Sequence, residues 1–293
     1  MINYSVLAVG MNTVSKEKQL IQDKLKRKSI TLDIASIKDP VFTIKDGVIG
    51  VEINKKDLKS YDYVWIQSGW NTTHMAYLLH ICLRFLNIPH NKPNIHTTKL
   101  SDIFSLASQG IQVPNTFFHN GLRINSQKEL EILEICKFPC IYKTALGSFG
   151  TDVFLIDRRE SIKQNIRDNR KFSRFIFQKY IPNDFDYRVI IANGKPVSIC
   201  KRIRTNDKYR NNVALGAREE FVNIKKISKD ILDTAIKATK VLNLNWAGVD
   251  IVTSKTTGKN YVLEVNRRPG LTQNSLETIC AYNYVKHLAK FYR

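Results

Sequence analysis

The chain has 293 residues, and its 46 lysines and arginines against 26 aspartates and glutamates give a formal net charge of +20. A chain of this length is able to bury the cores of roughly two or three packed lobes. No apolar run reaches the length of a transmembrane helix and no signal-peptide pattern opens the sequence, so we expect a cytoplasmic protein without a membrane segment. Its five cysteines form no Cys-x-x-Cys pair and are expected to be buried free thiols.

The first part of the chain, to about residue 95, is predicted to be a small α/β unit. Strands are expected over residues 5–9, 31–34 and 63–67, helices over 15–28 and 73–86, and a hairpin over 41–53. Strands that alternate with helices indicate a mostly parallel sheet. Trp70 follows the carboxyl end of one such strand, where open α/β sheets bind ligands, so it is a candidate substrate contact. The alternative is that Trp70 only fills an interface between lobes.

The next predicted elements are helix 99–109, strand 114–118, helix 126–136 and a strand that ends in Lys143. The loop after Lys143, Gly147-Ser148-Phe149-Gly150, has glycines three residues apart. Glycine lets backbone N–H groups approach a ligand closely, so this loop is a candidate for binding polyphosphate. A plain hairpin turn is the alternative. The loop has neither the Gly-Lys-Ser/Thr ending of a P-loop nor the spacing of a Rossmann fingerprint.

Three strands are predicted over residues 175–181, 186–191 and 196–200, and Asn193-Gly194 between the last two is a strong hairpin signal. The third strand runs on into Lys201, Arg202 and Arg204. Guanidinium donors match phosphate oxygens bidentately, so these side chains are candidates for a phosphate clamp. Solvated strand ends are the alternative, because arginine is mostly exposed in proteins.

Two acidic positions stand in neighbouring predicted strands near the end of the sequence. Asp250 is in the first strand, and Glu264 and Asn266 are in the second. Residues two apart in a strand share a face, so Glu264 and Asn266 are predicted to point one way and Leu263 and Val265 into the core. Mg²⁺ is usually held by such oxygen ligands together with nucleotide phosphates and water. The alternative is that these residues only close two strands before a turn.

Taken in order, these motifs resemble the ATP-grasp superfamily and, within it, the RimK-type carboxylate–amine ligases that attach glutamate or similar amino acids. The resemblance covers roughly residues 97–275. It implies an α/β protein built from α+β lobes, in which an ATP-grasp fold follows a pre-ATP-grasp α/β domain. The domains expected from it are 1–95 for the first domain, 96–178 for the central lobe with the Gly-rich loop, and 179–293 for the C-terminal lobe with the metal site.

The resemblance also implies roles for individual residues. The residues expected to bind ATP are Lys99, Lys143, Gly147, Ser148, Gly150, Gln178, Lys179, Tyr180, Ile181, Asp186, Arg210 and Asn211. The residues expected to act on the transferred phosphoryl group are Arg188, Arg202 and Asn212. The residues expected to hold two Mg²⁺ ions, with Mn²⁺ as an alternative, are Asp250, Glu264 and Asn266.

Two departures from the family pattern concern substrate and nucleotide recognition. Family members often carry a glutamate at the position of Lys179, so this side chain departs from the family pattern of adenine recognition. After Asn266 the family usually has small residues, whereas this chain has Arg267 and Arg268. We interpret the two arginines as a candidate clamp for an acidic substrate. The alternative is that they point to solvent or pair with surface carboxylates.

The function that the resemblance implies is an ATP- and Mg²⁺-dependent ligase that joins a carboxylate to an amine through an acyl phosphate. Its substrates are expected to be small molecules or peptides: an amino acid, a peptide or a protein terminus of acidic character. The alternative is a nucleotide-binding protein of this fold that docks on an anionic partner, such as RNA or the ribosome, without ligation, because the charge exceeds what an ATP site needs. A purely compositional origin of the charge is equally open. Homo-oligomers are an expectation from the family alone.

Overall fold

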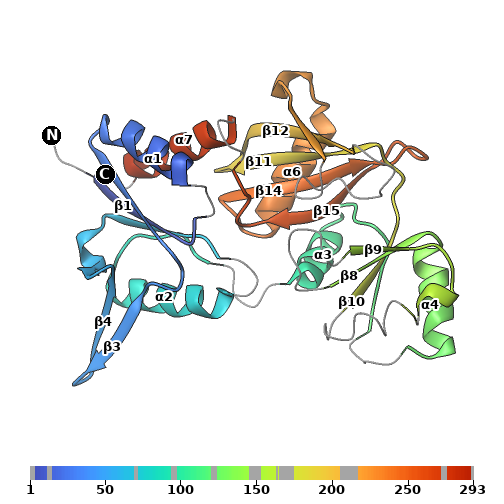
Figure 1. Ribbon diagram of the computed structural model, residues 1–293, viewed down its shortest axis with the longest axis horizontal. Coiled ribbons are helices and arrows are strands. Elements are labelled where there is room, and N and C mark those ends of the chain that lie inside the picture. Colours follow the sequence, from blue (N-terminus) through green and yellow to red (C-terminus); the bar gives the residue numbers. More distant parts are fainter. Residues whose placement is uncertain are drawn as a thin grey trace.

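The computed structural model describes residues 4–11, 15–68, 72–93, 98–119, 124–144, 153–162, 164, 175–204, 217–271 and 276–291. Their strands form a parallel sheet near the N-terminus, a small hairpin sheet beside it, a central antiparallel sheet and a larger antiparallel sheet (Figure 1). This arrangement agrees with the α/β class that the sequence predicts. None of the helices in the described ranges is long and apolar enough to cross a membrane.

The first sheet has the strand order β2-β1-β6 and is parallel, as the sequence predicts. Its elements are β1 (Tyr4–Val9), α1 (Ser15–Lys26), β2 (Ile30–Ala35), β6 (Tyr63–Ile66) and α2 (Thr73–Phe85). All four residues of β6 are buried. Such continuous burial is typical of a parallel strand that is covered on both faces. Helix α2 packs on one face of the sheet, and α1 packs on the other.

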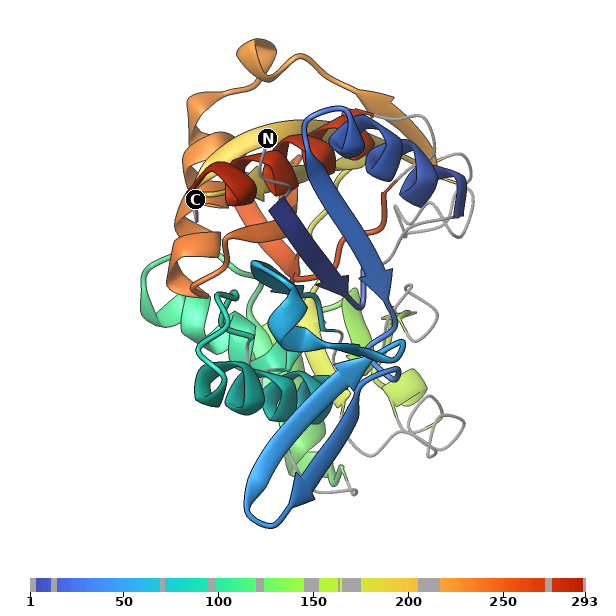
Figure 2. The same cartoon turned by 90° about the vertical axis from the view of Figure 1, so that its left-hand side faces the viewer.

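The predicted hairpin is present as β3 (Val41–Lys45) and β4 (Val48–Ile53), and β5 (Lys56–Asp57) pairs with β4 before a short 3-10 helix, η1 (Leu58–Ser60). Its turn has positive φ at both Asp46 (50°) and Gly47 (79°). Residues of this kind tolerate the left-handed region, which explains the tight reversal. Figure 2 shows the hairpin extending away from the rest of the molecule.

The central sheet has the order β7-β10-β8-β9 and is antiparallel. Its elements, with the two helices of this region, are α3 (Lys99–Ser108), β7 (Thr116–Phe118), α4 (Ser126–Cys136), β8 (Cys140–Thr144), β9 (Val153–Ile156) and β10 (Phe175–Lys179). Helix α3 begins with a capping box in which Thr98 and Ser101 satisfy each other's backbone N–H groups. Helix α4 supplies Ile132 and Cys136 to the core of this sheet.

The largest sheet has the order β13-β12-β11-β14-β15. Its elements, with two helical segments, are β11 (Phe185–Ala192), β12 (Lys195–Ile203), β13 (Arg218–Phe221), η4 (Ile224–Lys226), α6 (Lys229–Val241), β14 (Trp246–Thr253) and β15 (Asn260–Asn266). The predicted Asn193-Gly194 turn joins β11 to β12 with positive φ at both residues. Helix α6 covers one face of this sheet, which leaves the other face for the rest of the molecule.

The prediction that Leu263 points into the core is wrong. The pairing of β14 with β15 shifts after Asp250, so that Asp250 lies opposite Glu264 but Ile251 lies opposite Val262. Leu263 is the extra residue of this β-bulge and is only partly buried, whereas Val262 is fully buried in the core under α6. A bulge moves the side-chain alternation by one residue, which a strict period of two does not anticipate.

Helix α7 (Leu276–Phe291) returns from the C-terminal region to the first sheet. Tyr284 of α7 contacts the rings of Trp65 in β6 and Trp246 in β14, with ring centroids 4.9 and 5.2 Å away. Figure 1 shows α7 beside α1, and residues of α7 share one core with residues of both sheets. The helix therefore ties the two ends of the chain together, while the domain boundaries at residues 95 and 178 stay a prediction.

The prediction of buried, free cysteines is confirmed. The side chains of all five cysteines are buried and form no disulfide. Burial raises the pKa of each thiol, to about 11 for Cys136 and Cys280 and to about 12 for Cys140 and Cys200. These thiols are therefore core side chains rather than nucleophiles.

Candidate active site

The face of the largest sheet opposite α6 carries a group of charged side chains from four adjacent strands. The strand register sets Arg188 of β11 opposite Asp250 of β14, and Asp250 opposite Glu264 of β15. Asp186 and Arg202 face each other on β11 and β12. Pairing between the strands therefore brings together residues that are up to 78 positions apart in the sequence, counted from 186 to 264.

Asp250 is the centre of this group. The guanidinium of Arg188 donates to both of its carboxylate oxygens at 2.9 Å, and Arg202 lies 3.1 Å from Oδ2. Asn266 Nδ2 donates to the same oxygen at 3.2 Å. Burial raises the pKa of Asp250, but the two guanidinium charges more than offset it and lower the pKa to about 2. The carboxylate is therefore ionised throughout the physiological range.

Asp186 and Arg202 form a second buried pair beside it. Arg202 donates to the two Asp186 carboxylate oxygens at 2.6 and 2.7 Å. Burial raises the pKa of Asp186 to about 6, against the opposing effect of Arg202 and with a contribution from the charge of Asp250. Arg202 thus bridges two carboxylates. Such bidentate pairing fixes the guanidinium plane in the site.

Two lysines approach this face from the central part of the molecule. Lys99, the first residue of α3, lies with its Nζ 3.6 Å from Glu264 Oε1. Lys143 is in β8, and among the described residues it has no hydrogen-bond or ion-pair partner, although it is only 8% exposed. Burial and the nearby charge of Lys99 lower the pKa of Lys143 to about 8, against an opposing effect of Glu264. A buried ammonium without a counter-ion is costly, so this position favours an anionic ligand.

Residues 178–181, which are expected to bind ATP, lie at the end of β10 and directly after it. Gln178 is buried, and its side-chain amide donates to Thr116 Oγ1 at 2.9 Å. Lys179 is exposed, Ile181 is buried, and the Tyr180 hydroxyl accepts a hydrogen bond from Arg204 at 3.3 Å. Their role toward a nucleotide stays a prediction.

Arg267 has a partner that sequence reasoning did not anticipate. Its guanidinium donates to both carboxylate oxygens of Asp102 in α3 at 2.6 Å, and both side chains are more than nine-tenths buried. The arginine therefore neither points to solvent nor pairs at the surface. Asp102 lies three residues after Lys99, so both project from one face of α3 toward β15. That spacing is the signal in the sequence that would have pointed to Asp102.

Arg268 differs from its neighbour. It is partly buried, burial lowers its pKa, and it makes no ion pair within the described part of the chain. Of the two arginines, it is the one that still fits the predicted substrate clamp.

Several predicted site residues lie outside the described ranges. They are Trp70, Gly147, Ser148, Gly150, Arg210, Asn211 and Asn212. Their assignments remain expectations from the sequence.

The donor set of the predicted metal site fits a hard cation. Asp250, Glu264 and Asn266 supply carboxylate and amide oxygens, and no group of three His, Cys, Asp or Glu side chains within the described ranges offers another metal site. The four contacts of Asp250 occupy most of its lone pairs, whereas within the described residues Glu264 has only the contact with Lys99 at 3.6 Å. Mg²⁺ commonly takes one or two carboxylates and completes its shell with phosphates and water, so Glu264 is the most available ligand.

Comparisons with known proteins agree with this arrangement. The chain is 25% identical over 240 residues to beta-citrylglutamate synthase B of Danio rerio, a match that covers 78% of this chain but 58% of that protein, so the chain spans about three-fifths of its length. It is 30% identical over 231 residues to a probable alpha-L-glutamate ligase of Histophilus somni (strain 129Pt), covering 75% of this chain and 74% of the other.

The fold has a counterpart over its whole length. The structure of the ATP-grasp ligase PsnB complexed with a minimal precursor superimposes with a TM-score of 0.70 and 16% identity, covering 99% of both chains. The family model of the RimK-like ATP-grasp domain matches residues 97–288, which is more than half of the sequence. The protein therefore belongs to the RimK-like ATP-grasp family.

Proposed function

We propose that the protein is an ATP- and Mg²⁺-dependent ligase that joins a carboxylate to an amine. The observation that carries the proposal is the convergence of Lys99 and Lys143 on Glu264, beside the Asp250 cluster. Two lysines next to carboxylate oxygens form a site for a polyphosphate with its metal ion. The names of its relatives, a glutamate ligase and a citrylglutamate synthase, support an acidic amino acid or a related carboxylate as one substrate.

In the proposed reaction, a substrate carboxylate takes the γ-phosphoryl group of ATP to give an acyl phosphate and ADP. An amine then attacks the acyl carbon, phosphate leaves, and the amine loses a proton. The work of the protein is positioning and charge neutralisation, as in phosphoryl transfer generally. Lys143 and Lys99 would offset phosphate charge, and Arg202 would offset charge on the transferred group, because guanidinium donors match its oxygens.

Glu264, with Asp250 and Asn266, would hold Mg²⁺, which supplies charge neutralisation of the phosphates. We propose that the site holds two Mg²⁺ ions and that Mn²⁺ is able to replace them. Asp250 also orients Arg188, which donates to both of its oxygens. The proposed location of the reaction is a reducing cytoplasm, and the free cysteines support this proposal.

The test is Mg²⁺-dependent ADP release with a panel of amino acids, acidic peptides and small carboxylic acids, followed by mass spectrometry of the products. The proposal expects a product mass equal to amine plus acid minus water. Asp250→Asn should lower substrate-dependent ADP release by about 10²-fold or more. The substitution removes the negative charge that orients Arg188 and Arg202, and it weakens a proposed metal ligand. Asp184→Asn, at an exposed ion pair with Lys255, is the matched control.

Unchanged turnover in Asp250→Asn, with the fold intact by circular dichroism, would contradict the ligase assignment. The net charge of +20 favours a second function, docking on an anionic partner without ligation. Filter binding to RNA at low and moderate salt separates the two, because merely non-specific affinity collapses as salt rises.

A further inference from the structure

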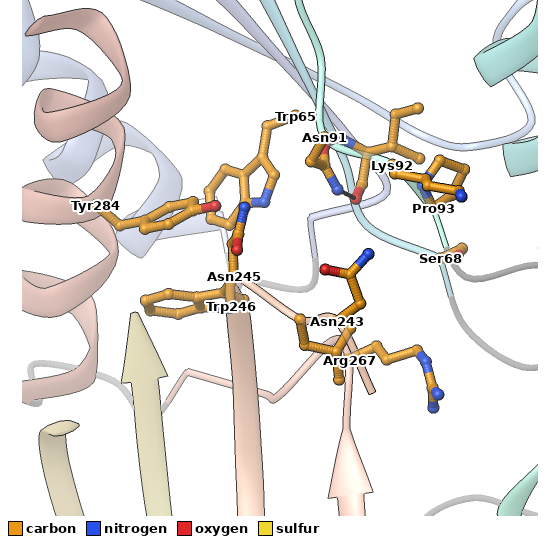
Figure 3. A pocket seen from close by; sticks show the side chains of 12 residues that line it. Trp65, Ser68, Asn91, Lys92, Pro93, Asn243, Asn245, Trp246, Arg267 and Tyr284 are labelled. Atoms are coloured by element: carbon orange, nitrogen blue, oxygen red, sulfur yellow. Dashed lines mark hydrogen bonds between the residues drawn. The ribbon is translucent and has the colours of Figure 1, made fainter. Parts of the chain in front are cut away.

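A polar cavity of about 80 Å³ lies where the first sheet meets the C-terminal sheet (Figure 3). One side of its wall comes from the end of β6 and the segment after α2, and the other from the loop between α6 and β14, with Tyr284 of α7. A single water needs about 10–15 Å³ by the same measure, so the cavity has room for roughly five to eight waters. That is the size of a small metabolite.

Several polar groups that line the cavity have no hydrogen-bond partner in the part of the chain that the structure describes. Trp65 is only 1% exposed, and Figure 3 shows its indole nitrogen on the side that faces Asn243 and Asn91. Within the described residues the indole N–H has no hydrogen-bond acceptor, whereas a buried tryptophan N–H usually finds one. Asn243 and Asn245 also line the cavity; both are exposed, and their side-chain amides have no partner among the described residues.

The charge around the cavity is positive. No aspartate or glutamate is among the residues that line it, and Lys92 makes no ion pair in the described part of the chain. Arg267 also borders the cavity, but its guanidinium extends away from the aromatic wall toward Asp102 (Figure 3). The amide of Asn91 is already bound to the backbone N–H and C=O of Ile66. The cavity therefore offers the N–H groups of Trp65, Asn243 and Asn245, together with the amide oxygens of the two asparagines.

We infer that this cavity binds a small carboxylate of amino-acid size, with the carboxylate oxygens accepting from Trp65, Asn243 and Asn245 beside the Lys92 charge. Ligand pockets occur preferentially at interfaces between domains and at the carboxyl ends of parallel strands, which is where this cavity lies. The residues of the Asp250 cluster do not line it. The inference goes beyond the proposed ligase activity and does not depend on it.

The test uses the full-length protein without nucleotide or Mg²⁺. Succinate is the probe, and succinamide, which has the same shape without charge, is its comparison. With 5-fluorotryptophan incorporated, the three tryptophans report binding by ¹⁹F NMR, after assignment by single Trp→Phe variants. Succinate is expected to shift the Trp65 and Trp246 signals in a saturable way, and succinamide is expected to bind at least about tenfold more weakly.

Two isosteric variants locate the site. Asn243→Asp and Asn245→Asp each place a negative charge in the wall and should weaken succinate binding by about tenfold, by repulsion at short range. Asn87→Asp is the matched control for Asn243→Asp, because both asparagines are exposed, follow a helix C-terminus and have positive φ (56° and 53°), but Asn87 does not line the cavity. Asn87→Asp should leave binding unchanged.

Three results would overturn the inference: no saturable shift up to tens of millimolar succinate, equal binding of succinamide, or equal affinity in Asn243→Asp and Asn87→Asp. Since binding is read without catalysis, failure of the ligase assay leaves this test standing. If the protein turns over substrate, a higher KM at unchanged kcat in Asn243→Asp would mean that the bound carboxylate belongs to a substrate. A change in kcat on adding succinate would mean that the bound carboxylate is an effector. Either result supports the site.

Discussion

Lys143 is an ammonium group in surroundings that disfavour its charge. It is buried, Lys99 is nearby, and Glu264 opposes the combined effect only in part, so the pKa falls to about 8. An anionic ligand reverses this balance, because it stabilises the charged form. The residue is therefore both a phosphate contact in the proposed function and a titratable group within reach of ordinary buffers.

Nucleotide affinity should depend on pH through Lys143. The free protein holds this proton below pH 8 and loses it above, while the bound phosphates need it, so affinity is full below pH 8 and falls as pH rises. We expect ADP to bind about five- to tenfold more weakly at pH 9 than at pH 7.5, measured by calorimetry. Lys143→Met should bind weakly at both values and lose this dependence. The same pH slope in Lys143→Met would contradict the assignment.

The two adjacent arginines should differ in their effect on stability. Arg267→Met leaves the Asp102 carboxylate buried without its partner, so the free energy of unfolding should fall by about 3–5 kcal/mol in urea titrations. Arg268→Met, which breaks no ion pair in the described part of the chain, should cost about 1 kcal/mol or less. Adding Asp102→Leu to Arg267→Met should restore much of the loss. Equal costs for the two arginine variants would exclude a structural role for the Asp102 pair.

At the scale of the elements, the β-bulge in β15 shapes the candidate site. It lies in the middle of the β14–β15 ladder, so that Asp250 stays opposite Glu264 on one side of the bulge while β15 pairs in a shifted register on the other side. Bulges are over-represented next to active sites, where they re-aim side chains. Helix α3 adds to this arrangement, since Lys99 and Asp102 both reach β15 from one helix face.

The bulge predicts an inverted order of two truncations. Val262→Ala removes a fully buried side chain and should lower the free energy of unfolding by about 1–3 kcal/mol. Leu263→Ala removes more atoms, but from the partly buried bulge residue, and should cost less than about 1 kcal/mol. Chemical denaturation of both variants measures this. A larger cost for Leu263→Ala would mean that β15 has no bulge at this position.

At the scale of the whole molecule, α7 joins the two ends of the chain. Its residues share a core with β1, α1 and β2 of the first unit, and Tyr284 packs against Trp65 and Trp246. Coupling of this kind makes distant segments unfold together, so the lobes are not independent in stability even where their sheets are separate.

Tyr284→Ala should therefore act on both lobes. Loss of this ring should cost about 3–5 kcal/mol and separate thermal unfolding into two steps when followed by tryptophan fluorescence and by circular dichroism. Ile279→Ala, a truncation at an exposed position of the same helix, is the control and should keep one transition. Coincident transitions in Tyr284→Ala would show that other contacts couple the lobes.

The sequence by itself determined the features that depend on neighbouring residues. The Asn193-Gly194 and Asp46-Gly47 turns, the helix over Ser126–Cys136 and the parallel first sheet follow from turn chemistry and hydrophobic period, which act over a few positions. The order of its motifs also indicated the family. The sequence therefore predicts the types of the elements and the candidate residues well, because the signals for both are local.

Only the tertiary structure decided which distant side chains meet. Arg267 and Asp102 are 165 residues apart, and no local pattern states that they pair. The bulge at Leu263 depends on the partner strand, and the place of Tyr284 depends on how the lobes close. The lowered pKa of Lys143 and the polar cavity beside Trp65 arise from burial across several elements. Burial and pairing are properties of the packed molecule, because the dielectric surroundings and partners of a side chain exist only once the elements are in contact.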